Sequence, residues 1–199
     1  MLAWISRLIS KKDRNYEQRF DRALKRSKSW GLDSVGFGRT SERFLNERSL
    51  NVFQQVASEY LCQHHAEDIS QQCFAVTLML KSPLEHALGV PLAYTLGFVE
   101  YNGRNVFYSD TRNLKAMLKE GVPSPSLNLH AWLTLPSLEV IDTTFGTTYG
   151  VVNQVPEAVG RMCFIHPDDM TAGMQYHPQL VGEDYLKRIG AMRLVLMPS

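Results

Sequence analysis

A cysteine, a histidine and an aspartate follow one another along this chain in an order that could support nucleophilic catalysis. Cys73 follows two glutamines and precedes the apolar run FAVTLML. If it lies in the first turn of a helix, unpaired backbone N–H groups and the helix dipole favour its thiolate form. His130 would then act as its base, and Asp142 would hold the imidazole in one tautomer. Taken singly, a buried structural cysteine and a hydrogen-bonded His–Asp pair are the simpler interpretations.

The segments around the histidine and the aspartate are predicted to form one hairpin. Residues 129–135 and 138–144 are rich in β-formers and are joined through a Pro-Ser dipeptide. If the loop has three residues, Trp132 faces Asp142 directly, and His130 is the diagonal neighbour of Asp142 on the same face. A two-residue loop places His130 and Asp142 on opposite faces. The sequence permits both arrangements, and we predict that the two side chains lie on one face of neighbouring antiparallel strands.

The cysteine is predicted to lie at the start of a helix. Ser70 is a suitable N-cap for a helix from Gln71 to about Lys81. Ser82-Pro83 is predicted to begin a further short helix, and Gly89 is predicted to end it as a left-handed C-cap. Of the three cysteines, we expect only Cys73 to be partly exposed at a helix N-terminus.

The rest of the chain mixes helices with antiparallel strands, which indicates an α+β fold. Asn102-Gly103 is a strong type I′ hairpin signal. The other predicted helices cover residues 3–27, 41–65, 113–120 and 183–189. The other predicted strands cover residues 91–100, 105–109 and 192–197. Beyond Gly146 the pattern weakens, and residues 166–178 are predicted to be irregular surface.

Four short pieces of the sequence stand in one order. Cys73 comes first, then the stretch GVPLAYTLGF at 89–98, then His130-Ala131-Trp132 and finally Asp142-Thr143-Thr144. Together they resemble transglutaminase-like proteins, which belong to the papain-like cysteine protease superfamily. That family shows a cysteine at a helix start, a G-[IV]-P-A-R-x-V-x-G-[YF] strand, an H-A-W strand and a final D-x-T. The resemblance covers about residues 68–146.

The sequence departs from the family pattern at two places. Ala93 stands where the family commonly has an arginine, so any substrate contact of that arginine is absent. Gln71-Gln72 replace the glycine or tryptophan often found before the cysteine. Either glutamine could donate to an oxyanion, and helix capping is the alternative role for both. Trp132 is a further candidate for a substrate contact.

The resemblance implies a papain/transglutaminase-like core, in which the nucleophile helix packs on an antiparallel sheet. It also implies a cysteine-dependent amide or ester hydrolase or acyltransferase: a peptidase, a deamidase or a transglutaminase. Cys73 would form a thioester with a protein or peptide substrate, His130 would shuttle the proton and Asp142 would orient the ring. The alternative is a non-catalytic binding or assembly module of the same family.

Charge divides the chain into two predicted parts, a helical basic arm over residues 1–48 and a transglutaminase-like domain over residues 49–199. The first part holds 12 Lys/Arg and 6 Asp/Glu, and the second holds 9 and 14. The arm would either fold back on the acidic body or contact a partner. A membrane or nucleic-acid adaptor is the weaker version of the second alternative, and we do not expect nucleic acid as a partner.

Composition excludes several classes of protein. Hydrophobic residues make up 44% and charged residues 21%, as in ordinary globular domains. No apolar stretch is long enough for a transmembrane helix, and the N-terminus does not fit a secretory signal. Three widely spaced cysteines indicate a reduced, cytoplasmic protein. We expect no metal and no cofactor, because no ligand spacing or glycine-rich nucleotide loop is present.

Overall fold

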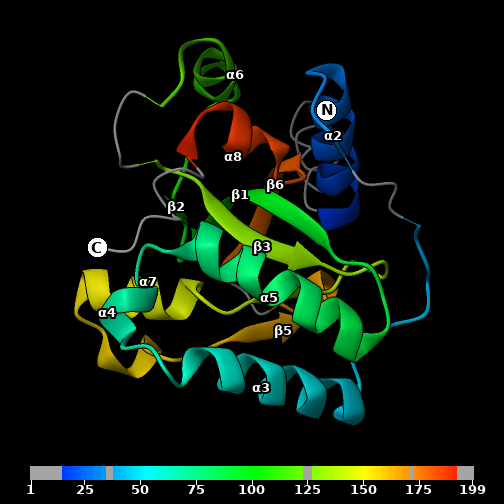
Figure 1. Ribbon diagram of the computed structural model, residues 1–199, viewed down its shortest axis with the longest axis vertical. Helices are drawn as coiled ribbons and strands as arrows, with labels where there is room; N and C mark the ends of the chain where they lie inside the picture. The colour runs from blue at the N-terminus through cyan, green and yellow to red at the C-terminus, as the bar shows by residue number, and fades with distance from the viewer. Residues whose placement is uncertain (1–14, 35–37, 123–126, 171–172, 192–199) are drawn as a thin grey trace, which may run out of the picture.

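The protein folds as a curled antiparallel sheet with helices on both of its faces (Figure 1). The computed structural model describes residues 15–34, 38–122, 127–170 and 173–191. Seven α-helices and six strands lie in this described part. The predicted α+β class is therefore confirmed. The first part of the predicted helix over residues 3–27 and the predicted strand over residues 192–197 lie outside the described residues.

Strand β1 (Ala93–Tyr101) is the centre of the sheet and pairs with three other strands. One of its edges pairs with β2 (Arg104–Val106) and β3 (His130–Thr134), and the other edge pairs with β6 (Met174–Val181). Beyond β3 follow β4 (Val140–Asp142) and β5 (Cys163–Ile165). All of these pairings are antiparallel.

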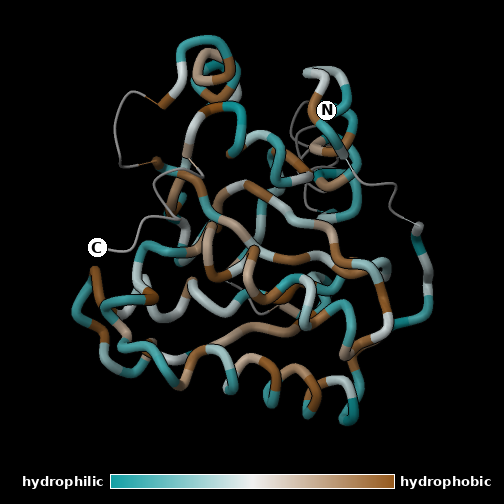
Figure 2. The backbone as a smooth tube through the Cα atoms, viewed as in Figure 1, coloured by the Kyte–Doolittle hydropathy of each residue, from teal (hydrophilic) through white to brown (hydrophobic). Residues whose placement is uncertain are grey.

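The helices cover two separate hydrophobic cores, one on each face of the sheet. Helices α5 and α3 pack on one face, and α2 packs against β6 on the other. Apolar residues recur at helical spacing along α3, which turns them toward α5 (Figure 2). The α-helices are α2 (Tyr16–Ser29), α3 (Glu47–Leu61), α4 (Ala66–Ile69), α5 (Cys73–Leu88), α6 (Thr111–Glu120), α7 (Phe145–Asn153) and α8 (Asp184–Arg188). Two 3₁₀ helices, η1 (Pro156–Ala158) and η2 (Pro167–Asp169), follow α7.

The turn predictions are confirmed where a left-handed backbone is required. Gly89 ends α5 with φ of 69°. Asn102 and Gly103 have φ of 50° and 72°, as a type I′ turn between β1 and β2 requires. The predicted break before Pro83 is wrong, because α5 runs through this proline without interruption. Its neighbours Leu80 and Leu84 are both buried, and their packing holds the two turns together.

The prediction of an irregular surface at 166–178 is wrong, because β6 begins within it. Proline and polar residues are unusual in a strand, so the sequence pattern did not indicate β6. Pro178 is accommodated where the pairing of β6 with β1 shifts register. Gly97 of β1 lies opposite Pro178, and a Cβ at Gly97 would lie 2.1 Å from the carbonyl oxygen of His177. Only glycine allows the two strands to approach this closely. Helix α7 and strand β5 also lie where the sequence pattern is weak.

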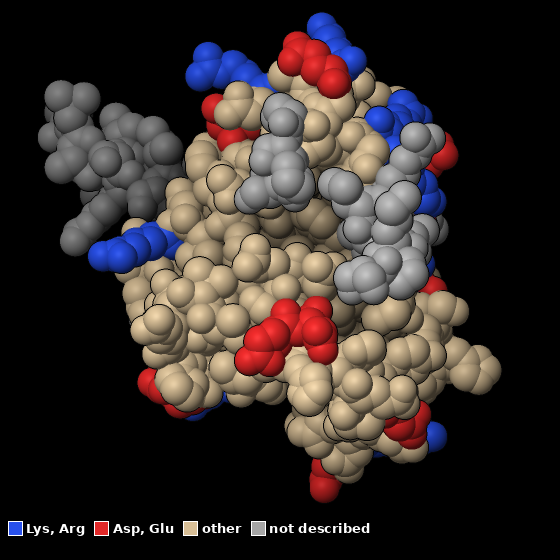
Figure 3. All heavy atoms as spheres, turned by 60° about the vertical axis from the view of Figure 1, so that its left-hand side comes forward, with Lys and Arg blue, Asp and Glu red and all other residues tan. Residues whose placement is uncertain are grey.

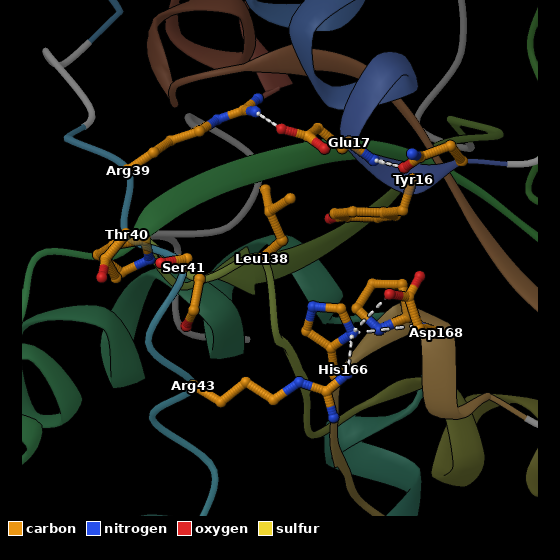
Figure 4. Close-up of a pocket in the computed structure, with 13 residues that line it drawn as sticks. Tyr16, Glu17, Arg39, Thr40, Ser41, Arg43, Leu138, His166 and Asp168 are labelled. Atoms are coloured by element: carbon orange, nitrogen blue, oxygen red, sulfur yellow. Dashed lines mark hydrogen bonds and ion pairs between the residues drawn. The ribbon is translucent and has the colours of Figure 1, made fainter.

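Part of the basic arm belongs to the fold, because α2 packs on the sheet. Phe20 and Ala23 are fully buried there, and the hydroxyl of Ser27 accepts a hydrogen bond from the backbone of Val181. Arg39 forms an ion pair of 2.6 Å with Glu17 (Figure 4). The arm thus folds back on the body between residues 15 and 29. The predicted boundary between residues 48 and 49 falls inside helix α3.

We expect Tyr16→Phe to lower the free energy of unfolding by about 1–3 kcal/mol, because a buried indole N–H loses its acceptor. The Tyr16 hydroxyl accepts from Trp132 Nε1 at 2.9 Å and hydrogen-bonds Thr134 Oγ1 at 2.8 Å. Urea unfolding measures the change. Tyr60→Phe is the matched control, since Tyr60 is 40% exposed and should lose almost nothing. Equal stability of the two variants would show that α2 is not anchored through this hydroxyl.

Candidate active site

Cys73 is the first residue of helix α5. Its predecessor Gln72 is the N-cap and makes no side-chain bond to the helix. The first intrahelical bond runs from Val76 N to Gln72 O, so the earlier N–H groups have no partner within the helix. The predicted helix start was two residues early, because Ser70 ends α4 and Gln71 has a left-handed φ of 63°. The sulfur therefore lies at the positive end of the α5 dipole.

Cys73 is less accessible than expected. Its exposed fraction is 8%, whereas Cys62 is exposed and Cys163 is intermediate. The prediction that Cys73 alone would be partly exposed is therefore wrong. The physical reason is that its sulfur lies against the chain just before β3, 3.9 Å from the carbonyl oxygen of Leu129.

His130 and Asp142 lie on neighbouring strands and are joined by a hydrogen bond of 2.6 Å between Nε2 and Oδ2. The register pairs Leu133 with Ile141, which puts the aspartate diagonally across from the histidine on the same face. A three-residue loop sets this register, and its last residue, Leu138, has φ of 77°. The structure thus shows the three-residue loop, with His130 and Asp142 on the same face of the sheet.

The Asp142 carboxylate accepts hydrogen bonds on both oxygens. Oδ2 accepts from the hydroxyl of Tyr176 at 2.8 Å in addition to His130. Oδ1 accepts from the backbone N–H groups of Thr144 and Phe145 at 3.0 Å each, where helix α7 begins. Sequence reasoning missed Tyr176, because it stands in the segment predicted to be irregular. The Thr144 hydroxyl also donates to Oδ1, at 3.3 Å, so five donors from three parts of the fold fix the carboxylate in place.

These contacts keep the pair charged although both side chains are fully buried. Burial by itself would raise the pKa of Asp142, but the charge of His130 and the hydrogen bonds to the carboxylate lower it below its usual value. Burial by itself would lower the pKa of His130, but Asp142 and then Cys73 raise it to about 10. The geometry therefore favours an imidazolium beside a carboxylate.

The second ring nitrogen of His130 is available to the cysteine. Nδ1 is buried and makes no hydrogen bond of ordinary geometry to any described residue. The Cys73 thiol is nevertheless near enough for its interaction with the ring to contribute to the raised pKa of His130. Catalytic hydrogen bonds are often long in a free enzyme and tighten when substrate binds. Nε2 thus faces the Asp142 carboxylate, and Nδ1 is available to exchange a proton with the Cys73 sulfur.

A cavity of about 310 Å³ is lined by both Cys73 and His130, and we call it the site cavity. Phe107 lines it too and stacks on the imidazole, with ring centroids 5.2 Å apart and an angle of 18° between the planes. Phe107 has φ of 61°, a conformation that costs a non-glycine residue roughly 1–3 kcal/mol. Apart from Cys73 and His130, no described residue that lines the site cavity has an ionisable side chain. Figure 3 shows the side of the molecule that carries β2 and α7, and large areas of it are free of charged side chains.

The three residues predicted to contact substrate do not all reach the site cavity. Gln71 and Gln72 are exposed and line it next to Cys73. Trp132 shares a face of the sheet with His130 but does not line the site cavity, because its indole is fully buried where α2 packs. Its N–H is already donated to Tyr16. The structure thus places the glutamines beside the sulfur and gives Trp132 a packing role.

A larger cavity lies elsewhere and contains none of these residues. It has about 470 Å³ and is lined by the start of α2, residues 39–43, the β3–β4 turn and residues 166–168 (Figure 4). Its two arginines already have acidic partners: Arg39 pairs with Glu17, and Arg43 pairs with Asp169 at 2.6 Å. With these charges neutralised, the cavity offers a ligand no free charge from its arginines.

Comparison of the chain with protein-family models, with curated proteins and with solved structures found no match. Within the described residues, no cluster of three or more His, Cys, Asp or Glu side chains could hold a metal ion. In the same part of the chain, no helix has the length and apolar character needed to cross a membrane. The function is therefore to be inferred from the chemistry of the site itself.

Proposed function

We propose that the chain is a cysteine-dependent hydrolase or acyltransferase that acts on amides or esters. The observation that carries the proposal is the ordered contact of three groups: Cys73 at a helix N-terminus, His130 beside it, and Asp142 on the far nitrogen of the ring. Nucleophile, base and orienting group are the parts that thiol catalysis needs. The resemblance to transglutaminase-like proteins points to the same order and to the same papain-like fold.

The reaction would proceed through a thioester. The Cys73 sulfur attacks the substrate carbonyl, the C–N or C–O bond to the leaving group breaks, and His130 gives its proton to the departing nitrogen or oxygen. In the second half, His130 takes a proton from water or from an amine. That nucleophile displaces the sulfur, which releases an acid or a new amide.

The start of α5 would stabilise the negative oxygen that forms during attack. The backbone N–H of Cys73 lies in the first turn of the helix, where it has no intrahelical partner. The Gln71 and Gln72 side chains line the site cavity beside it, and each has an amide N–H₂ to donate. A preorganised donor of this kind contributes about 10²–10³-fold to the rate.

The lining of the site cavity suggests which acyl groups fit. Its apolar residues include Phe74, Leu127 and Val152, and its uncharged polar residues include Asn128 and Thr148. We therefore propose that the acyl group that enters the site cavity is uncharged and that it belongs to a protein or peptide substrate. A thiol nucleophile must stay reduced, which fits a cytoplasmic location.

A second candidate is a binding module of the same fold whose triad is idle. The observation that favours it is the small exposed fraction of Cys73, 8%, whose sulfur lies against the backbone of Leu129. A substrate must gain access past the groups that bury the sulfur. If it cannot, the site cavity would bind a ligand without reacting with it.

Selective alkylation distinguishes the two candidates without a known substrate. With iodoacetamide at about pH 5.5, where an ordinary thiol is almost wholly protonated, we expect Cys73 to react faster than the more exposed Cys62. Peptide mass spectrometry measures both rates. In His130→Ala the preference should disappear. If Cys62 reacts faster in the unaltered protein at this pH, Cys73 is not activated and the binding module is favoured.

A further inference from the structure

A second cavity, of about 370 Å³, reaches the His130–Asp142 pair from the opposite end. We call it the rear cavity. It is lined by Asp142 and Tyr176 but not by His130 or Cys73, whereas the site cavity is lined by the latter two. It lies between α7, β5 and the ends of β1 and β6. Its size falls within the range of small-molecule sites.

Aromatic side chains form much of its wall. Tyr101 lies edge-to-face against Phe145, with centroids 5.7 Å apart, and against Tyr149, with centroids 4.9 Å apart. Phe145 and Tyr149 stack on each other at 6.0 Å. The thioethers of Met162 and Met174 also line the rear cavity, and such side chains adapt to the outline of an apolar ligand. This lining suits a flat apolar body.

The polar groups at its inner end are already occupied. The Asp142 oxygens accept from His130, from backbone N–H groups and from the Tyr176 hydroxyl. The Cys163 thiol stays uncharged, because burial and then the charge of Asp142 raise its pKa to about 12. A ligand therefore finds no free negative charge among the inner groups.

The charged side chain that remains available is Arg161, which is exposed and lines the same cavity. Its Nε donates to the carbonyl oxygen of Glu157 at 2.6 Å. Its guanidinium forms no ion pair with any residue that the structure describes. The two terminal nitrogens can therefore receive a carboxylate in the bidentate geometry that arginine favours.

We propose that the rear cavity binds a small carboxylate with a flat apolar body. The body lies against Tyr101, Phe145 and Tyr149, and the carboxylate pairs with Arg161. This site is separate from the site cavity and does not depend on the proposed catalysis. Binding is therefore measurable in Cys73→Ala protein as well as in the unaltered chain.

Calorimetry with 2-naphthoate and its uncharged analogue 2-naphthalenemethanol tests the proposal. We expect Arg161→Gln to weaken 2-naphthoate binding about tenfold, because a charge-assisted pair is lost, and to leave the uncharged analogue unchanged. Arg48→Gln is the matched control, because this exposed arginine of α3 removes the same charge and does not line the rear cavity. Equal weakening in both variants would indicate a general charge effect and would overturn the assignment of Arg161.

Protection of Cys163 tests the location. The thiol lines the rear cavity, and its raised pKa makes it react slowly, so its alkylation by excess N-ethylmaleimide is followed over hours. Bound 2-naphthoate should lower that slow rate at least about fivefold, in proportion to the occupied fraction. The exposed Cys62 is the internal control and should react at an unchanged rate. If 2-naphthoate leaves Cys163 unprotected at concentrations that saturate binding, the ligand lies elsewhere. If it does not bind at all, the rear cavity is not a carboxylate site.

Discussion

Cys73→Ala is expected to abolish turnover, with a loss of at least about 10³-fold in kcat/KM, because no other group of the site can form the acyl intermediate. His130→Ala should be almost as damaging, since the sulfur loses its base and its proton donor. A panel of activated esters and anilides gives the rates. Hydroxylamine trapping, read by mass spectrometry, detects the thioester on the peptide that contains residue 73.

The matched control is Cys62→Ala, which removes an exposed thiol at the end of α3 and should leave all rates unchanged. The loss in Cys73→Ala must not come from unfolding, so urea curves of the two variants are compared. Cys73 has an exposed fraction of only 8%, and its replacement leaves a small cavity, so a modest loss of stability is expected. Unchanged turnover of a real substrate by Cys73→Ala would exclude covalent catalysis by this residue.

Much of the site's geometry could be predicted because short-range rules determine it. The pairing of β3 with β4 follows from the apolar pattern of the two segments and the length of one loop. The predicted start of this helix, Gln71, lies only two residues before the observed start of α5 at Cys73. The polar residues in front of the apolar run indicate a helix N-terminus at this place. These features depend on neighbours along the chain, so a single sequence contains the necessary information.

The supporting groups could not be predicted, because distant parts of the chain supply them. Tyr176 reaches Asp142 from β6, 34 residues further along the chain. Phe107 reaches His130 from the chain after β2, in a backbone conformation that sequence patterns do not suggest for phenylalanine. The burial of Cys73 has the same origin, because Leu129 that covers its sulfur comes from another element. Only the folded sheet brings these groups together.

The behaviour of Trp132 shows how a motif residue can be misassigned. The H-A-W sequence marks the strand correctly, and His130 and Trp132, two residues apart, share one face of the sheet. Strand pairing alone does not show which element packs over each part of that face. The indole meets helix α2, whose Tyr16 accepts its N–H. The packing of α2 on the sheet therefore decides the role of this tryptophan. From the sequence, the arm that contains α2 could either fold back on the body or contact a partner.

Asp142→Asn is expected to lower anilide turnover at least about 100-fold by reversing the tautomer of His130. The Asn oxygen would stay with the backbone N–H groups of Thr144 and Phe145, which already donate to Oδ1. Its N–H₂ group would then face Nε2 of His130, which must become an acceptor. The neutral ring would carry its proton on Nδ1, toward the sulfur, and could no longer take the proton of Cys73.

Asp142→Asn should also shift the pH dependence of anilide turnover to lower pH, because it lowers the pKa of His130. In the unaltered protein Asp142 makes the largest contribution to raising this pKa, to about 10. His130 therefore stays an imidazolium at pH values well above 6.5, the ordinary pKa of histidine. Anilide turnover needs that proton for the leaving nitrogen, so it should fall only as the pH rises through the raised value. Without the carboxylate, burial lowers the pKa, and the alkaline limb should move down by at least about one pH unit.

A comparison of two substrates isolates this effect from unfolding. A nitrophenyl ester has a leaving group that departs without a proton, so its rate should lack the alkaline limb that the matching nitroanilide shows. Tyr176→Phe removes another donor to Asp142 and keeps the charge of the carboxylate, so it should leave the limb near its original pH. If Asp142→Asn and Tyr176→Phe shift the anilide limb equally, the carboxylate charge does not set the protonation of His130, and the ion-pair mechanism must be abandoned.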